Sequence, residues 1–140
     1  MIYLAQTDTT AGFLSQNLNE LNLIKNRPLN QPCVITTAKF AILKKFARVP
    51  NKFKNLVRRS RKTSFIYPNK KAVRVVKNHA HSDFLDQIGW AYSTSANLHG
   101  SKFDLNFAKS KAHKIIDDKF FVSNPSKIFK ISKTKIKKIR

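Results

Sequence analysis

Hydroxyl and amide side chains alternate in one short stretch of the chain. Ser93, Ser95 and Asn97 are separated by single residues, so in an extended segment all three point to one face. The stretch follows Trp90-Ala91-Tyr92, which is typical of a strand, and polar groups at strand ends bind ligands in α/β folds. Such groups can hydrogen-bond phosphate or ribose oxygens. The alternative is a Ser/Asn-rich turn that satisfies only its own backbone.

Two cations stand close together before a proline. Lys25 and Arg27 are separated by one residue, and Pro28 fixes the direction in which the chain leaves them. Arginine offers a planar fork suited to phosphate or carboxylate, and lysine offers a point charge. Like charges this close repel each other, which costs stability unless an anion lies between them. The alternative is a solvated basic helix end, which the helix dipole favours.

Two further segments combine polar groups with apolar neighbours. Thr7 and Thr9 directly follow a predicted strand and offer hydroxyls on one side, although an ordinary Thr/Asp turn fits as well. Arg74 lies in the middle of the apolar segment Ala72–Val76. If it is buried, its charge needs an anionic partner. The alternative places Arg74 on the exposed face of a half-buried strand.

Neither the histidines nor the cysteine forms a metal-binding pattern. His79, His81, His99 and His113 do not combine with Cys33 or with paired acids at ligand spacing, so we expect no metal site built by the protein. A single cysteine cannot form an internal disulfide, which fits a reducing cytoplasm. Its apolar surroundings favour a small buried side chain over a nucleophile.

Basic residues greatly outnumber acidic ones. The 140 residues include 28 Lys and Arg but 7 Asp and Glu, for a formal net charge of +21 at pH 7. Residues 25–62 contain twelve cations and no acid, and residues 101–140 contain twelve cations and three acids. Such blocks favour an electrostatic groove for a polyanion, of which nucleic acid is the commonest.

Alternating apolar patterns predict an α/β domain with a mixed sheet, because two of the strands form a hairpin. Leu14, Leu18, Leu21 and Ile24 fall at helical spacing, with Ser15 as a possible cap. The predicted strands cover 1–5, 32–36, 63–67, 72–76, 90–92, 114–116 and 127–131; the other predicted helices cover 38–46, 50–59, 83–88 and 105–108. We predict a domain over residues 1–132 and a basic tail over 133–140. The tail is either a flexible arm, which we favour, or a final strand.

Taken in order, these segments resemble one known family. Thr-Asp-Thr at 7–9 with a following glycine, Lys-x-Arg-Pro at 25–28, the Ala-Val-Arg-Val strand at 72–75 and Ser-Thr-Ser-Ala-Asn-Leu-x-Gly at 93–100 are similar to the YrdC-like threonylcarbamoyl-AMP synthases. The resemblance extends from about Thr7 to Ser126, and the serine-rich motif is its most specific part. It implies an α/β fold: a single YrdC-like domain with a twisted mixed β-sheet flanked by helices.

The resemblance also implies an activity, that of an L-threonylcarbamoyladenylate synthase (a nucleotidyltransferase). Members join L-threonine, bicarbonate and ATP into threonylcarbamoyl-adenylate and release pyrophosphate, with Mg²⁺ normally accompanying ATP. Partner proteins then transfer the threonylcarbamoyl group to the adenosine beside the anticodon of tRNA. The implied partners are L-threonine, bicarbonate, RNA (tRNA or double-stranded RNA) and other tRNA-modification proteins.

The resemblance assigns roles to nine residues. The residues implied to bind the nucleotide and its phosphates are Lys25, Arg27, Ser93, Ser95 and Asn97. The residues implied on the threonine side are Thr7, Thr9, Arg74 and Ser126.

Several positions depart from the family pattern. Gln6 and Ala11 replace a proline and an aromatic residue around the threonine loop, Lys127 replaces the threonine of a late Pro-Ser-Thr-Ile segment, and Val76-Lys77-Asn78 stands where Pro-x-His often follows the strand. The chain is also shorter than its relatives. The departures fall mostly on the threonine side.

Two other functions therefore compete with the synthase. One is a non-catalytic basic RNA-binding module on the same fold, and the other is a different ATP-dependent carbamoyl-handling enzyme. No apolar stretch approaches a transmembrane helix, and the N-terminus lacks a signal-peptide pattern. We therefore expect no membrane partner and a cytoplasmic location.

Overall fold

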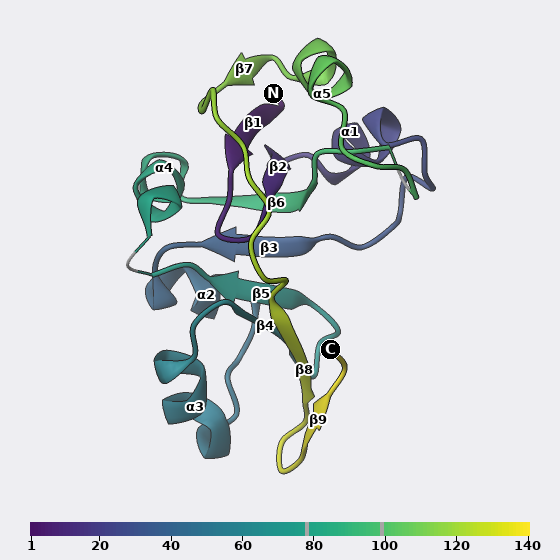
Figure 1. Cartoon of the computed structure of the whole chain (residues 1–140). Coiled ribbons are helices and arrows are strands. Elements are labelled where there is room, and N and C mark those ends of the chain that lie inside the picture. Colours follow the sequence, from purple (N-terminus) through teal and green to yellow (C-terminus); the bar gives the residue numbers. More distant parts are fainter. Residues whose placement is uncertain (78, 99) are drawn as a thin grey trace. The chain divides into compact units, whose positions relative to one another are not determined.

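The structure is a computed structural model that describes residues 1–77, 79–98 and 100–140. Asn78 and His99, both considered in the sequence, lie outside the described residues. The chain divides into two compact units, each assembled from two separate segments. Unit 1 comprises residues 1–33 and 91–124, and unit 2 comprises residues 34–90 and 125–140. Figure 1 shows the elements of both.

Unit 1 is built on strands of both directions. β1 (Tyr3–Gln6) pairs antiparallel with β2 (Ala11–Ser15) and parallel with β7 (Lys114–Ile115). β2 also pairs antiparallel with β6 (Trp90–Ser95), which carries the two serines of the polar stretch. The core contains Ile2, Leu4, Ala11, Phe13, Leu21, Ala96 and Ala108, with the helices α1 (Leu18–Ile24) and α5 (Leu105–Lys111) contributing to it.

The expectation that a helix runs from Leu14 is wrong, because residues 11–15 form β2 and every one of them is buried. A short, fully buried strand is apolar on both faces, so Leu14 fits helical spacing by coincidence. The cap of α1 is Asn17, whose side chain accepts from the Glu20 backbone N–H at 3.2 Å. Ser15 instead accepts from the Asn17 N–H at 3.0 Å.

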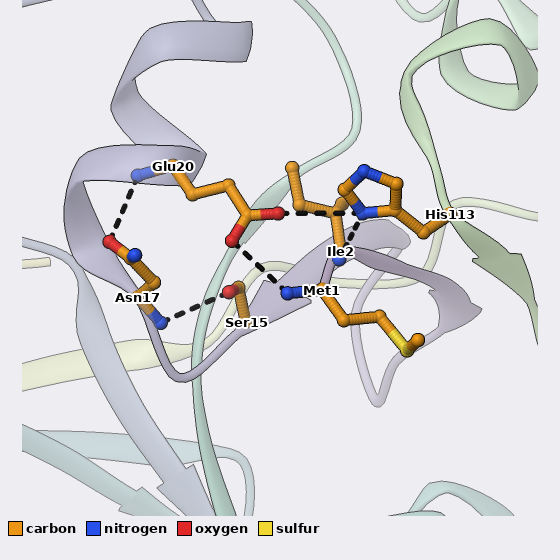
Figure 2. Close-up of polar contacts among 6 residues, drawn as sticks. All are labelled: Met1, Ile2, Ser15, Asn17, Glu20 and His113. Atoms are coloured by element: carbon orange, nitrogen blue, oxygen red, sulfur yellow. Dashed lines mark hydrogen bonds and ion pairs between the residues drawn. The ribbon is translucent and has the colours of Figure 1, made fainter.

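A polar cluster joins the start of α1 to the residues before β1, to the end of β2 and to His113 (Figure 2). Glu20 accepts from the amino group of Met1 at 3.1 Å, and the His113 Nδ1 accepts from the Ile2 N–H at 2.8 Å. Because that nitrogen is an acceptor, its 3.4 Å approach to Glu20 is not a hydrogen bond in this tautomer. The cluster fixes where α1 begins, and α1 in turn positions Lys25.

Unit 2 contains the predicted hairpin. β4 (Thr63–Ile66) pairs antiparallel with β5 (Ala72–Val75), and β5 pairs parallel with β3 (Val34–Thr37). On its other side β4 pairs parallel with β8 (Lys127–Ile131). Aromatic side chains pack along these strands, with the rings of Phe65 and Phe129 stacked 6.0 Å apart.

Helices complete unit 2. They are α2 (Phe40–Phe46), the 3₁₀ turn η1 (Asn51–Phe53), α3 (Lys54–Arg59) and α4 (Ala80–Ile88). Pro50 caps η1, so the single helix predicted over 50–59 begins as a tighter turn. α4 begins before the predicted residue 83, because the His79 side chain accepts from the His81 N–H at 3.0 Å and caps it.

The basic tail forms a strand, so the flexible arm that the sequence favoured is not what the structure shows. β9 (Ile136–Lys138) pairs antiparallel with β8, with Ile131 opposite Ile136. Ile131 is buried at 2 % exposure, and this pairing gives the alternating basic and apolar residues a strand geometry.

The prediction of an α/β fold with mixed strand directions is confirmed by these pairings. Within the described ranges, none of the helices combines the length and apolar character needed to cross a membrane.

Candidate functional site

Lys25 is the centre of a polar cluster in unit 1. It caps the C-terminus of α1 and is only 3 % exposed. Its ammonium donates to the Ser95 carbonyl at 2.7 Å, to the Ser95 hydroxyl at 3.3 Å and to the Asn97 Oδ1 at 3.4 Å. The structure therefore brings together three of the five residues predicted to bind a nucleotide.

The environment of Lys25 disfavours its charge. The pKa of Lys25 is lowered to about 8, mainly by burial and to a smaller extent by the Arg27 guanidinium, while the Cys33 thiol acts in the opposite direction. The three oxygens that accept from the ammonium belong to uncharged groups. An anionic ligand would favour the ammonium, so the cluster is suited to phosphate.

Asn97 is held with its oxygen toward the lysine. Its Nδ2 donates to the carbonyls of Leu98 at 2.8 Å and Ser101 at 2.7 Å, which fixes the orientation of the amide. The turn interpretation of this stretch is thus partly correct, because the amide does satisfy its own turn. The same bonds leave Oδ1 to accept from Lys25.

Arg27 is held by contacts that the sequence analysis missed. Its Nε donates to the Asn22 Oδ1 at 2.6 Å, and its NH2 donates to the Cys33 Sγ at 2.8 Å. Burial raises the pKa of the Cys33 thiol, and Arg27 and Lys25 oppose that effect. Cys33 is therefore half-buried beside a cation rather than enclosed among apolar residues.

Asn22 is the centre of this arrangement. It is completely buried, and its Nδ2 donates to the carbonyls of Leu29 and Gln31, each at 2.9 Å. One amide thus ties the loop after Pro28 to α1 and orients Arg27. Leu18, Leu21 and Asn22 occupy one face of a helix at spacing i, i+3, i+4, so a polar residue on that face was the signal available in the sequence.

Substituting Asn22→Leu is expected to reduce the free energy of unfolding by about 1–3 kcal/mol, because two partly buried backbone carbonyls and one guanidinium N–H lose their partner. Urea denaturation measures the change. Asn106→Leu is the matched control, since this exposed residue uses only its backbone N–H in the cap of α5. Equal stability of the two variants would contradict a structural role for Asn22.

The threonine loop satisfies much of its own hydrogen bonding. The Thr7 hydroxyl donates to the Thr10 carbonyl at 2.7 Å and accepts from the N–H groups of Thr9 and Thr10, both at 3.2 Å. The hydroxyls of Thr7 and Thr9 lie 3.3 Å apart. Thr7 is buried and shapes the loop, whereas Thr9 is partly exposed. The ordinary-turn alternative thus describes the loop's internal bonding.

Glycine at position 12 permits this loop to lie against β2. A Cβ there would come within 2.6 Å of the Thr7 methyl group and 3.3 Å of the Thr94 carbonyl. It would also lie 3.7 Å from the hydroxyl of Ser93, which is buried on β6 opposite Leu14. Ser93 is thus placed near the threonine loop, two residues from Ser95.

Arg74 and Ser126 meet in unit 2. Arg74 is buried at 6 % exposure, and its NH1 donates to the hydroxyls of Ser64 at 3.3 Å and Ser126 at 3.2 Å. The register explains the first contact, since Arg74 on β5 is directly opposite Ser64 on β4. The alternative of an exposed strand arginine is therefore wrong.

A second arginine, not identified from the sequence, also reaches Ser126. The Arg140 Nε donates to the Ser126 carbonyl and its NH2 to the Ser126 hydroxyl, both at 3.0 Å. The strand β9 brings Arg140 to this position, so the sequence offered no signal once the tail was interpreted as a flexible arm.

Metal-binding groups do not gather in the described part of the chain, where no three His, Cys, Asp or Glu side chains come close enough to hold an ion. Unit 1 brings a lysine and an arginine beside hydroxyl and amide groups. Unit 2 adds two guanidinium groups around a serine.

Fold and site together define an α/β domain whose cations are positioned by serine and asparagine. A family model for Sua5, YciO and YrdC, described as "Telomere recombination", matches residues 7–140. The chain belongs to the Sua5/YciO/YrdC family. This family includes threonylcarbamoyl-adenylate synthases and is associated with tRNA threonylcarbamoyladenosine modification. The predicted family resemblance is therefore confirmed, and the fold is a single YrdC-like domain.

Solved structures share this fold. The chain superposes on a double variant of P. abyssi Sua5 with a TM-score of 0.82 at 17% identity, covering 99% of this chain and 52% of that one. P. abyssi Sua5 complexed with L-threonine gives 0.79 at 20% identity, with coverage of 99% and 49%. E. coli YciO gives 0.76 at 15% identity, with coverage of 99% and 82%.

The chain spans about half the length of the two Sua5 structures. At these identities the likeness shows a common fold. No curated protein sequence matches the chain.

Proposed function

We propose that the protein synthesises threonylcarbamoyl-adenylate from L-threonine, bicarbonate and ATP for the modification of tRNA. The observation that carries this proposal is the buried Lys25 ammonium, directed at Ser95 and Asn97. The family resemblance assigns these same three residues to the nucleotide and its phosphates. Their convergence from separate parts of the sequence supports an intact nucleotide site.

The reaction requires alignment and charge neutralisation more than covalent help. The threonine amine adds to the carbon of bicarbonate and water leaves, which gives a carbamate. A carbamate oxygen then attacks the α-phosphorus of ATP, and pyrophosphate departs with the bonding electrons. Lys25 and Arg27 would stabilise the negative charge on the phosphates, with Mg²⁺ entering as part of the ATP substrate.

The resemblance implies Thr7, Thr9, Arg74 and Ser126 for the threonine side, and we propose that Arg74 of unit 2, held by Ser126, binds threonine. The solved Sua5 structure in complex with L-threonine supports this substrate by homology of fold. Arg74 offers a guanidinium for the threonine carboxylate, and Ser126 holds that guanidinium at 3.2 Å.

The net charge of +21 favours RNA as a partner, as tRNA or double-stranded RNA. Other tRNA-modification proteins would receive the unstable adenylate. A cytoplasmic location is proposed because the single cysteine fits a reducing compartment.

The test is to incubate the protein with ATP, bicarbonate and L-threonine and to measure pyrophosphate and threonylcarbamoyl-adenylate. We expect both products, in equal amounts and only when threonine is present. RNA binding without any threonine-dependent product would instead identify a non-catalytic RNA-binding module. A product formed without threonine would identify a different carbamoyl-handling enzyme.

The nucleotide site should lose affinity for ATP as the pH rises through about 8, the pKa of Lys25. The sign follows because the protonated ammonium binds phosphate and the neutral amine does not; the affinity is therefore highest well below this pKa. The Cys33 thiol is not the source of this step, because burial raises its pKa above the usual thiol range. Titration calorimetry on both sides of pH 8 measures the change.

Lys25→Gln is the control for that pH dependence, since it has no proton to lose at this position. Its ATP affinity should be weaker at every pH and should lack the step near pH 8. An identical step in this variant would assign the titration to another group.

A further inference from the structure

Helices α2 and α3 of unit 2 enclose a pocket that the proposed reaction does not use. Its volume is about 330 Å³, at the lower end of the range for small-molecule sites. Phe40, Leu43 and Val57 supply an apolar floor. Leu43 and Val57 are buried in the core, so the floor is rigid, while Phe40 is partly exposed.

Cations surround this apolar floor. Lys44, Arg48, Lys54 and Arg58 all line the pocket and are exposed. None of the residues that line it is acidic, and the sequence has no acid anywhere between residues 25 and 62. A ligand that complements this pocket must therefore combine negative charge with an apolar part.

The Phe40 ring is fixed at the edge of the pocket. The Lys77 ammonium lies 4.9 Å from the centre of that ring and donates a hydrogen bond to the Arg58 carbonyl. Lys77 thus links the aromatic residue of α2 to the end of α3. Lys77 covers one face of the ring, so a flat group would stack on the opposite face.

A second hollow continues the line of positive charge. It has a volume of about 620 Å³, and it shares Arg48 with the first pocket. Lys52 and Lys133 lie along it, and the Lys52 ammonium is held by the Thr134 carbonyl at 3.0 Å. Cations therefore extend over two adjoining hollows, which fits a ligand with several successive negative charges.

We propose that the α2–α3 pocket binds single-stranded RNA, with one unstacked base against Phe40 and the flanking phosphates on the four rim cations. The strand continues past Arg48 into the second hollow. Stacking platforms bordered by cations are the usual means of binding single strands. This inference rests on the RNA partner of the proposed function but not on its chemistry.

Other anionic partners fit the pocket less well. A peptide of acidic residues alone has no aromatic group to stack on the Phe40 ring, and duplex RNA keeps its bases stacked on one another, so the apolar floor would stay empty. A fatty acyl chain would leave the second line of cations unused. The combination of a small apolar pocket with a continuing cationic track favours the single strand.

The test uses fluorescence anisotropy with a short labelled single-stranded RNA, with an abasic strand of the same length that lacks every base, and with a duplex. The unmodified protein should bind the intact strand about fivefold or more tighter than the abasic strand. Equal affinity for the two strands would overturn the proposal, as would tighter binding of the duplex. Site-dependent binding to anionic vesicles or to polyglutamate, but not to RNA, would overturn it as well.

Charge variants locate the site. Arg48→Gln with Arg58→Gln should reduce the steepness of the log–log salt dependence by about 1.4, because each lost phosphate contact contributes about 0.7 on a single strand. The matched control removes two exposed cations from α5 of unit 1, in Lys109→Gln with Lys111→Gln, and should leave this steepness nearly unchanged. Equal effects of the two double variants would show binding by overall charge and overturn the site.

Substitutions of the apolar residues test the contribution of the pocket separately from that of the rim cations. Phe40→Ala should weaken binding of the intact strand about five- to tenfold and leave the abasic strand unaffected. Ala47→Ile is a second variant, because Ala47 lines the pocket and its extended backbone accepts a β-branched residue. The larger side chain should fill the pocket and weaken binding of the intact strand, as Phe40→Ala does. Circular dichroism checks that both fold. If the protein binds RNA as expected but forms no adenylate, only the proposed reaction is contradicted. The two results are independent because the binding assay contains no ATP or threonine.

Discussion

Replacing Lys25 by alanine is expected to lower kcat/KM for ATP at least about 100-fold, the usual effect of removing one preorganised charged donor from a reacting group. Lys25 is 3 % exposed and its ammonium has three oxygen contacts on Ser95 and Asn97, so the charge is held in one position. Threonine-dependent pyrophosphate release measures the loss.

Two controls accompany the Lys25→Ala experiment. Lys109→Ala removes one exposed cation from α5 and should retain full activity, which excludes an effect of net charge. Thermal unfolding distinguishes lost chemistry from lost folding, because the variant also removes bonds between α1 and β6. A folded Lys25→Ala protein with unchanged kcat/KM would show that ATP does not bind at this cluster.

Arg74→Gln is expected to raise KM for threonine about 30-fold or more, the lower limit for losing one partner of a buried charged pair. The buried guanidinium is held by Ser64 and Ser126, so it is positioned before a substrate carboxylate arrives. Glutamine retains hydrogen-bonding capacity but carries no charge. Steady-state kinetics with threonine varied at saturating ATP provide the measurement.

The Arg74→Gln variant should affect threonine binding specifically. KM for ATP should change much less than KM for threonine, because the residues proposed for the phosphates lie elsewhere in the sequence. Arg59→Gln, an exposed arginine of α3, is the matched control and should behave like the unmodified protein. If Arg74→Gln raised both KM values equally, Arg74 would have a general structural role.

Much of the fold could be predicted from local patterns. The segments 63–66 and 72–75 are apolar, end at turn residues and form strands β4 and β5, so their periodicity was sufficient. Two strands were not predicted, for opposite reasons. Ala11–Ser15 is buried on both faces and therefore has no alternation, and Ile136–Lys138 is an exposed edge strand whose lysines are typical of an arm.

The candidate site was predictable to the extent that its residues form motifs. Lys25, Ser95 and Asn97 could be identified as a set because the serine-rich motif is specific and the lysine precedes a proline. Asn22 and Arg140 could not, because their contacts depend on a loop returning to α1 and on β9 pairing with β8. Tertiary contacts of this kind leave no local signal.

Both units are assembled from chain segments that emerge from the ribosome at very different times. The Ile2 N–H donates a hydrogen bond to His113, 111 residues later in the chain, and β4 has only one neighbouring strand until β8 has been synthesised. During synthesis, β1 and β4 therefore expose unpaired edges until the last third of the chain appears. Exposed strand edges make an incomplete chain prone to aggregation. Such non-local pairing also slows folding. Production of this protein should accordingly benefit from slow synthesis at low temperature and from chaperones that shield open strands.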